Sequence, residues 1–186
     1  KEIIEEEKKY NIGNYPISVL HKDLSIILNE FKRICDKYNI KYTLWAGTAL
    51  GAIKYHNFIP WDDDADVAML RKEYNKFVKA CRKELDNSKF VLDTIETNKY
   101  CFTVMGKLKL KNTYFPENWM KGSINPLPHL FIDILIFDKT FKGICKIQKN
   151  ISRFWNIPRT IKIHANVTHK NMFFFKILSL LPLCIL

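Results

Sequence analysis

The stretch Ile59-Pro-Trp-Asp-Asp-Asp-Ala-Asp-Val-Ala-Met69 places four carboxylates within five positions and then passes into an apolar run. Successive side chains of a strand point to opposite faces, so a strand over residues 64–70 would put Asp64 and Asp66 on one face and turn Val67 toward the core. Carboxylates this close raise one another's pKa unless a hard divalent cation neutralises them. The pattern therefore predicts a site for Mg²⁺ or Mn²⁺, with a charged loop that caps the next helix as the alternative.

Apolar spacing on both sides of this stretch predicts the surrounding elements. Three- and four-residue apolar steps predict helices over residues 20–38 and 73–85, the first with Ser18 as its N-cap and Asn39 as its end. A brief helix is expected over 49–55, and a loop with several Pro and Gly residues over 112–128. Apolar runs and alternation predict strands over 42–46, which ends at Gly47-Thr48, and over 90–94, 101–110 and 130–137.

One charged residue interrupts the most apolar of these strands, Leu130 to Phe137. Asp133 lies on the same strand face as Phe131 and Leu135. An ionised carboxylate inside a buried strand is costly unless it is paired or binds a metal ion. Asp133 is therefore a candidate for the same metal site, and a structural ion pair is the alternative.

Composition limits the class of protein. The 186 residues are 47% hydrophobic, enough for a real core and most simply one domain. The net charge of +11 favours anionic partners, although a basic surface that only keeps the protein in solution explains it equally well. The lysines are spread along the chain without zinc-finger spacing or an RNP-type aromatic signature, so no nucleic-acid partner is expected.

The cysteines and the two ends of the chain bear on its location. Five cysteines at wide, irregular spacing favour buried reduced thiols and a reducing, cytoplasmic compartment. No signal peptide is visible at Lys1, and the absent initiator Met indicates a fragment or a processed form. The apolar tail over 172–186 contains Lys176 and Pro182 and is shorter than the ~20 residues that span a bilayer. It is expected either to lie at an anionic lipid surface, as a peripheral membrane contact, or to be a core helix.

The run from Trp45 to Asp66, with Gly-Thr-Ala-Leu-Gly and Ile-Pro-Trp-Asp-Asp-Asp-x-Asp in it, closely resembles the LicD family, the phosphocholine-transferase-like group that includes fukutin and fukutin-related protein. The resemblance covers roughly residues 20–140, through Arg71-Lys-Glu-Tyr74, Lys107 to Thr113 and Phe131-Ile-Asp-Ile134. It implies a nucleotidyltransferase-like α/β (α+β) domain with a mixed sheet flanked by helices. An N-terminal extension over 1–19 would precede this domain, and a basic and apolar helical region over 141–186 would follow it.

What the resemblance implies for activity is metal-dependent transfer of a phospho-alkyl group, such as phosphocholine or a polyol phosphate. The donor would be CDP-linked and the acceptor a sugar hydroxyl of a cell-surface glycan or glycolipid. Asp64 and Asp66 match the family's metal-binding pair, and Asp62 and Asp63 match its acidic flank. Asp133 stands where a third carboxylate is expected, as a third metal ligand or as the base for the acceptor hydroxyl.

Further residues of the matched segments are candidates for substrate binding. Gly47, Thr48 and Gly51 would lie against donor phosphates, with Thr48 as a helix N-cap the alternative. Lys54, His56 and Lys107 would neutralise the leaving CMP, or be solvated surface groups. The aromatic candidates for stacking on cytosine or enclosing choline are Trp45, Trp61 and Trp119, with core packing the alternative for the first two.

Two departures from the family pattern keep other functions open. Lys54-Tyr55-His56 stands where the family often has Arg-His, and a lysine binds phosphate without bidentate geometry. The chain also ends early, within an apolar segment. One alternative is a catalytically silent relative that binds nucleotide or glycan. The other is a conventional nucleotidyltransferase, against which the Ile-Pro-Trp-Asp-Asp-Asp segment argues.

Overall fold

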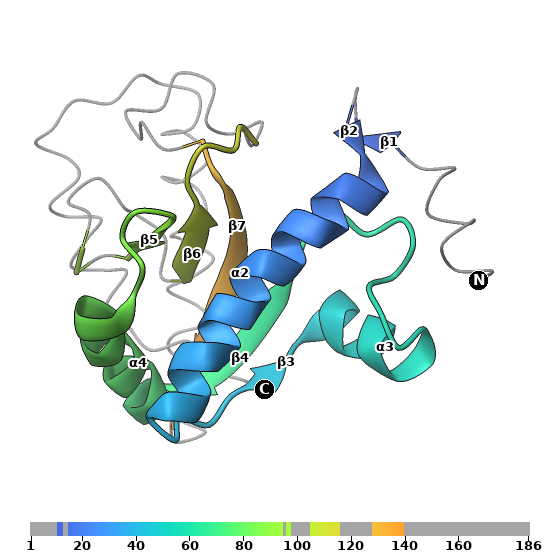
Figure 1. Ribbon diagram of the computed structural model, residues 1–186. Helices are drawn as coiled ribbons and strands as arrows, with labels where there is room; N and C mark the ends of the chain where they lie inside the picture. Colours follow the sequence, from blue (N-terminus) through green and yellow to red (C-terminus); the bar gives the residue numbers. More distant parts are fainter. Residues whose placement is uncertain (1–10, 13–14, 95, 98–104, 116–127, 140–186) are drawn as a thin grey trace, which may run out of the picture.

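The computed structural model describes residues 11–12, 15–94, 96–97, 105–115 and 128–139 (Figure 1). Its helices are α2 (Ile17–Lys37), α3 (Ala46–Lys54) and α4 (Arg71–Glu84). Its strands are β1 (Asn11–Ile12), β2 (Tyr15–Pro16), β3 (Thr43–Leu44), β4 (Asp66–Leu70), β5 (Phe90–Asp93), β6 (Gly106–Leu110) and β7 (Leu130–Phe137).

The main sheet has five strands in the order β3-β4-β7-β6-β5. Strands β4 and β7 run parallel, whereas the other neighbouring pairs are antiparallel. Strands β1 and β2 form a separate short hairpin before α2. The expected α/β class with a mixed sheet is confirmed.

Helix α2 covers one face of this sheet, and α4 packs beside the C-terminal half of α2 (Figure 1). The face beneath α2 is apolar: Ile132, Ile134 and Ile136 of β7 are fully buried. Phe31 of α2 and Phe77 of α4 meet with ring centroids 4.8 Å apart, both fully buried. Because strand side chains alternate, the acidic residue of β7 points to the opposite face, which α2 does not cover.

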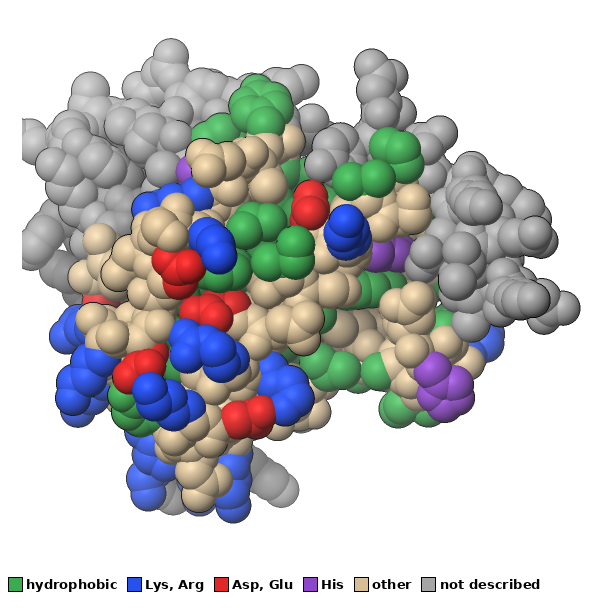
Figure 2. Space-filling view, viewed as in Figure 1, with side chains coloured by type: hydrophobic (Ala, Val, Ile, Leu, Met, Phe, Trp, Pro, Cys, Tyr) green, Lys and Arg blue, Asp and Glu red, His purple; other side chains and the backbone are tan. Residues whose placement is uncertain are grey.

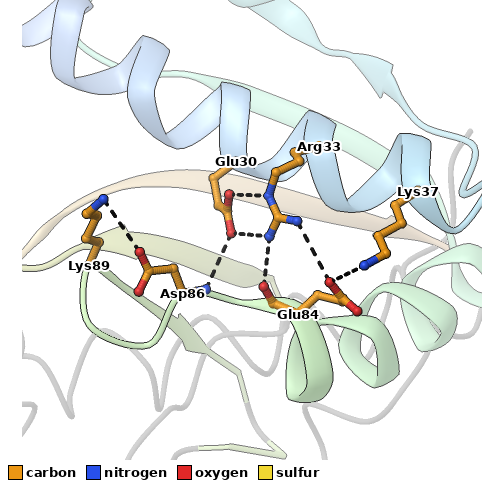
Figure 3. A network of polar contacts seen from close by, with 6 residues as sticks. All are labelled: Glu30, Arg33, Lys37, Glu84, Asp86 and Lys89. Carbon is orange, nitrogen blue, oxygen red and sulfur yellow. Dashed lines mark hydrogen bonds and ion pairs between the residues drawn. The ribbon is translucent and has the colours of Figure 1, made fainter.

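A charged network joins the C-terminal ends of α2 and α4 (Figure 3). The Arg33 guanidinium donates to both Glu30 carboxylate oxygens and to the Glu84 carbonyl oxygen. Lys37 pairs with the Glu84 carboxylate at 2.6 Å. Pairs this exposed contribute at most about 1 kcal/mol each, so they fix how the two helices meet more than they stabilise the fold. Acidic and basic side chains are intermixed on the surface over this part of the molecule (Figure 2).

The start of α2 differs from the sequence prediction, whereas its end agrees. The N-cap is Pro16 and not Ser18, because Pro16 is extended (φ −62°, ψ 132°) and still pairs within β2. Proline has no N–H to lose at a helix start. Asn39 follows the C-cap residue with φ 48°, the left-handed conformation that ends helices, as predicted.

The Gly47-Thr48 pair was expected at the end of a strand, and this expectation is wrong. Strand β3 stops at Leu44, and α3 begins at Ala46, whose φ of 44° turns the chain directly into the helix. Gly47 and Thr48 therefore lie in the first turn of α3. The expected helix over 49–55 starts three residues earlier than predicted.

Several sequence predictions fall outside the described residues: the strand portion over 101–104, Trp119, the C-terminal region and its apolar tail. Cys35 and Cys81 are buried free thiols, as expected for these two cysteines. Within the described ranges, no helix combines the length and apolar character needed to cross a bilayer.

We predict that Gly51→Ala lowers the free energy of unfolding by about 1–3 kcal/mol. The added methyl group would lie 2.7 Å from the Asn57 carbonyl oxygen and 2.9 Å from the Ile59 amide nitrogen, so backbone must move. Alanine in place of glycine ordinarily stabilises a helix by about 1 kcal/mol, so the sign of the change is diagnostic. Urea denaturation measures it.

The matched control is Gly47→Ala in the same helix, where the methyl group would meet only the flexible Asp62 carboxylate. This variant should keep wild-type stability or exceed it. If Gly51→Ala is equally stable, the tight packing of α3 on the following loop is not a constraint on the fold.

Candidate active site

The acidic segment occupies the connection into β4 and the first residue of that strand. Strand β4 begins at Asp66, so Asp62, Asp63 and Asp64 precede it. The prediction that Asp64 and Asp66 share a strand face is therefore wrong in its detail, because Asp64 lies in the loop. The loop still brings Asp64 close enough for the charges of Asp66 and Asp133 to act on it.

A row of charged residues runs across the sheet at this point. The register pairs Asp66 of β4 with Asp133 of β7, and Asp133 with Lys107 of β6. Paired residues on neighbouring strands project from the same face. The Asp133 amide also donates to the Ala65 carbonyl oxygen at 2.9 Å, which extends the pairing one residue before β4. The acidic loop and β7 are thus held together by backbone contacts.

Asp133 is less deeply placed than the sequence suggested. Its side chain is 20% exposed, because the β7 face that it shares with Leu135 and Phe137 is only partly covered. The Lys107 ammonium lies 3.2 Å from Asp133 Oδ1. The ion pair considered as an alternative for Asp133 is therefore present, with Lys107 as the partner, and Asp66 lies on the other side of Asp133.

Two contacts from other elements fix the acidic segment. The Thr48 hydroxyl accepts a hydrogen bond from the Asp66 amide at 2.8 Å, so the buried Thr48 positions the start of β4. His21 of α2 donates from Nε2 to the Asp62 carbonyl oxygen at 2.7 Å, since a carbonyl can only accept. The His21 ring is buried and stacks on Phe58 at 4.6 Å.

Sequence reasoning gave His21 no role. The available signal was a single histidine on the buried stripe of the predicted helix, three residues before Leu24, a pattern that equally fits an ordinary core histidine.

Gly47 gives the Asp62 carboxylate its room. A Cβ atom at Gly47 would lie 2.4 Å from Asp62 Oδ2. The first turn of α3 and the acidic loop therefore lie close together here, and a side chain at position 47 would require the Asp62 carboxylate to move. Because free amide groups at a helix start attract anions, the same turn is suited to phosphate.

The electrostatics of the segment disfavour its charged form. Partial withdrawal from water is the largest cause that raises the pKa of Asp64 to about 6, and the surrounding carboxylates add to it. Partial burial and then the Asp133 charge raise the pKa of Asp66 to about 6, whereas Lys107 acts in the opposite direction. Burial and the Asp63 charge also raise the pKa of Asp62.

Such a donor set fits a hard divalent cation, which prefers carboxylate oxygens and would relieve this repulsion. One carboxylate oxygen from each of Asp62, Asp63 and Asp64 lies within 4.8 Å of the others. The charges of Asp66 and Asp133 also raise the pKa of Asp64. Asp64 therefore connects the group Asp62, Asp63 and Asp64 with the carboxylates on the sheet.

The remaining candidates lie around α3. Lys54 and His56 are exposed at the end of this helix, with the Lys54 ammonium 5.1 Å from the centre of the Tyr55 ring. Trp61 is 51% exposed and its ring lies 6.2 Å from that of Tyr55, so the core-packing alternative for Trp61 is wrong. Trp45 packs on Phe137 at 4.8 Å and is 38% exposed. The structure brings Lys107, unlike Lys54 and His56, into direct contact with a candidate carboxylate.

Comparison with known proteins points to one family. A model of the LicD/FKTN/FKRP nucleotidyltransferase domain matches residues 39–183. The lipopolysaccharide cholinephosphotransferase LicD of Haemophilus influenzae is 38% identical over 145 residues, which cover 77% of this chain and 51% of the relative. An uncharacterised protein of Rickettsia prowazekii is 32% identical over 69 residues, 37% of this chain and 24% of that protein. The chain therefore spans about half the length of the first relative and less of the second.

We predict that the metal-free protein loses stability as the pH rises from about 4 to about 6. An unfolded aspartate has a pKa near 3.9. With folded-state pKa values of about 6 for Asp64 and Asp66, the folded chain binds more protons in this window, so its free energy of unfolding falls as they leave. Asp66→Asn should flatten this dependence and stabilise the chelator-treated protein at pH 7 by about 1 kcal/mol, after allowance for solvent screening.

Urea denaturation at pH 4.5 and 7 in chelator measures both effects. The control is Asn75→Ala on the exposed surface of α4, which removes no titratable group and should keep the wild-type dependence on pH. An Asp66→Asn profile parallel to that of the wild type would contradict the electrostatic description of the row.

Proposed function

The chain belongs to the LicD family of nucleotidyltransferase domains, and on this basis we propose that it transfers a phospho-alkyl group from a CDP-linked donor to a sugar hydroxyl of a cell-surface glycan or glycolipid. Phosphocholine and lipopolysaccharide are the first group and acceptor to test, because the Haemophilus influenzae relative carries both in its name. A polyol phosphate is the second group to test.

The observation that carries this proposal is the pairing of Asp66 with Asp133 beside the acidic loop. Two strands far apart in sequence place carboxylates side by side, and nearby Asp64 adds a third. Burial and mutual repulsion hold the pKa of Asp64 and of Asp66 at about 6. Carboxylates with raised pKa values are typical of functional sites. The function that fits their chemistry is to bind a cation that neutralises the phosphates of the donor.

In the proposed site, Asp64, Asp66 and Asp133 hold Mg²⁺ or Mn²⁺. The ion supplies charge neutralisation on the phosphates of the donor. Asp62 and Asp63 form the acidic rim, and the contact between Asp62 and Gly47 keeps this rim against α3. His21 and Thr48 position the segment through its backbone and need not touch substrate.

Donor binding is assigned to the first turn of α3 and the surface that follows it. The amides near Gly47 are the anion-binding groups, and Gly51 allows the close approach of α3 to the following loop. Lys54 and His56 extend from the end of the same helix into solvent, where they would meet the departing CMP. Exposed Trp61 offers an aromatic face for cytosine or for the choline ammonium.

The proposed transfer is a displacement at phosphorus. The acceptor hydroxyl oxygen forms a bond to the phosphorus of the transferred group, and the bond from that phosphorus to the CMP oxygen breaks. The hydroxyl proton passes to a carboxylate of the site, which is Asp133 where this residue serves as the base in place of its role as third metal ligand, and CMP leaves as an anion. Positioning and charge neutralisation supply most of the acceleration in reactions of this type.

An assay with three donors tests the proposal against its alternatives. The full chain is incubated with lipopolysaccharide and Mg²⁺, and with CDP-choline, CDP-ribitol or CTP. Transfer of choline phosphate or ribitol phosphate with release of CMP supports the proposal. Transfer of CMP itself from CTP identifies a conventional nucleotidyltransferase, and nucleotide binding without transfer identifies a silent relative.

We predict that the double variant Asp64→Asn, Asp66→Asn loses transfer by about a thousandfold or more, because several kcal/mol of charge stabilisation disappears with the ion. Its far-UV circular dichroism should match that of the wild type, since both changes relieve repulsion. Asp36→Asn serves as the surface control and should retain full activity. Substantial turnover by a well-folded double variant would refute the metal assignment.

A further inference from the structure

Trp45 stands on the sheet face opposite α2, next to the carboxylate of Asp66. Its backbone is extended (φ −130°, ψ 158°), and its amide donates to the Asp66 carbonyl oxygen at 3.0 Å. This contact continues the antiparallel register of β3 with β4 by one residue. Side chains of paired residues project from the same face. The indole ring is therefore a neighbour of the candidate metal ligand Asp66.

The indole ring of Trp45 crosses β4 and meets Phe137 of β7. The two ring centroids are 4.8 Å apart, and the ring planes are inclined by 60°. Strand β4 lies between β3 and β7, so the contact has to pass over it. Ala68 lies on this face of β4, and its short side chain leaves room for the indole. Because strand side chains alternate, Phe137 shares its face with Asp133, four residues earlier on β7.

We refer to these two rings as the Trp45/Phe137 corner, because their planes meet at an angle and do not form one flat surface. Trp45 is 38% exposed, and Phe137 is partly buried. A planar base stacks on a single open aromatic face. A rounded apolar cation, such as a trimethylammonium group, can contact two aromatic faces at once. The shape of the corner therefore favours the cation over the base.

Charge separates this corner from the other exposed aromatic pair, Tyr55 and Trp61. The Lys54 ammonium lies 5.1 Å from the centre of the Tyr55 ring, and the Trp61 ring is 6.2 Å from that of Tyr55. A second cation beside this pair would be repelled, whereas an anion would be attracted. In the part of the chain that the structure describes, no lysine or arginine lies over either ring of the Trp45/Phe137 corner.

The charged groups around the corner are also suited to a cation. Asp66 adjoins it directly, whereas Lys107 lies beyond Asp133, two strands away from β4. At the far end of β4, the Arg71 guanidinium is held by the Asp138 carboxylate in a bidentate pair, so its charge is balanced. An ammonium at the corner would therefore meet aromatic faces and a carboxylate together, the combination that binds quaternary ammonium groups well.

From these contacts we propose that the Trp45/Phe137 corner receives the trimethylammonium group of a transferred phosphocholine and so selects choline over a polyol. The inference rests on the proposed function and names the group that its site prefers. With the donor phosphates between the acidic row and the first turn of α3, the choline group extends over the sheet face that the indole covers. The surface around Lys54 and Trp61 is then left for the nucleotide.

Donor binding to the full chain tests the inference by isothermal titration calorimetry with Mg²⁺ and no acceptor. The two probes are CDP-choline and CDP-3,3-dimethylbutanol, in which a carbon atom replaces the ammonium nitrogen, so the shape stays and the charge is lost. The wild type is expected to bind CDP-choline roughly 3- to 30-fold more tightly than the neutral analogue. Trp45→Leu keeps an apolar side chain and should lose most of this preference, whereas Trp45→Phe should keep part of it. A merely structural role would change both affinities equally.

Trp61→Leu is the matched control, because it removes an exposed indole from the other aromatic pair. It should keep the wild-type ratio of the two affinities, even if both become weaker. Equal binding of the two probes by the wild type, an unchanged ratio in Trp45→Leu, or a lost ratio in Trp61→Leu would overturn the inference and leave the proposed function standing. If Trp45→Leu does not fold, the wild-type ratio and Phe137→Leu decide in its place.

CDP-ribitol serves as a third probe that separates the inference from the proposed function. A chain that binds CDP-ribitol but not CDP-choline overturns the choline assignment alone. A chain that binds none of the three CDP-linked probes overturns the assignment together with the proposed function.

Discussion

The parallel pairing of β4 with β7 is the constraint on which the rest of the site depends. It places Asp66 beside Asp133 and so creates a repulsion that the neighbouring elements must accommodate. Lys107 on the next strand supplies a positive charge to this row, whereas Thr48 and His21 hold the backbone around it. The buried face of the same strands packs under α2. The apolar core on this side of the sheet stabilises the fold and so offsets the repulsion between carboxylates on the other side.

This division between two faces explains how the domain keeps residues that oppose its own stability. The raised pKa values of Asp64 and Asp66 represent free energy lost first to their partial burial and then to the charges of neighbouring carboxylates. The apolar contacts of Phe31 and Phe77 lie on the opposite side of the sheet and are independent of these charges. Conditions that change the charges should therefore alter stability without altering the core.

The strand Leu130–Phe137 could be predicted to the residue because a short, almost wholly apolar run that is rich in isoleucine and follows a loop favours a buried strand. The Gly47-Thr48 turn could not, since its conformation depends on where α3 meets the acidic loop. Asp62, Asp63, Asp64 and Asp66 were identified from their local crowding, and Asp133 from its place inside an apolar strand. The contact of Lys107 with Asp133 was not, because strand order is a property of the whole fold and leaves no periodic signal in the sequence. His21 was missed for the related reason that its partner is a backbone carbonyl 41 residues away.

That same strand order governs when the site can form. Arg71 and Asp138, whose bidentate ion pair closes the far end of the β4–β7 ladder, are 67 residues apart, and every pair in this parallel ladder has the same separation. Closing so long a loop is slow, because the chain loses conformational entropy before the strand contacts that compensate for this loss can form. During synthesis the acidic loop must leave the ribosome well before β7 exists. The nascent chain thus carries its aspartates as an open, hydrated segment, and Asp66 comes to lie beside Asp133 only as a late event in folding.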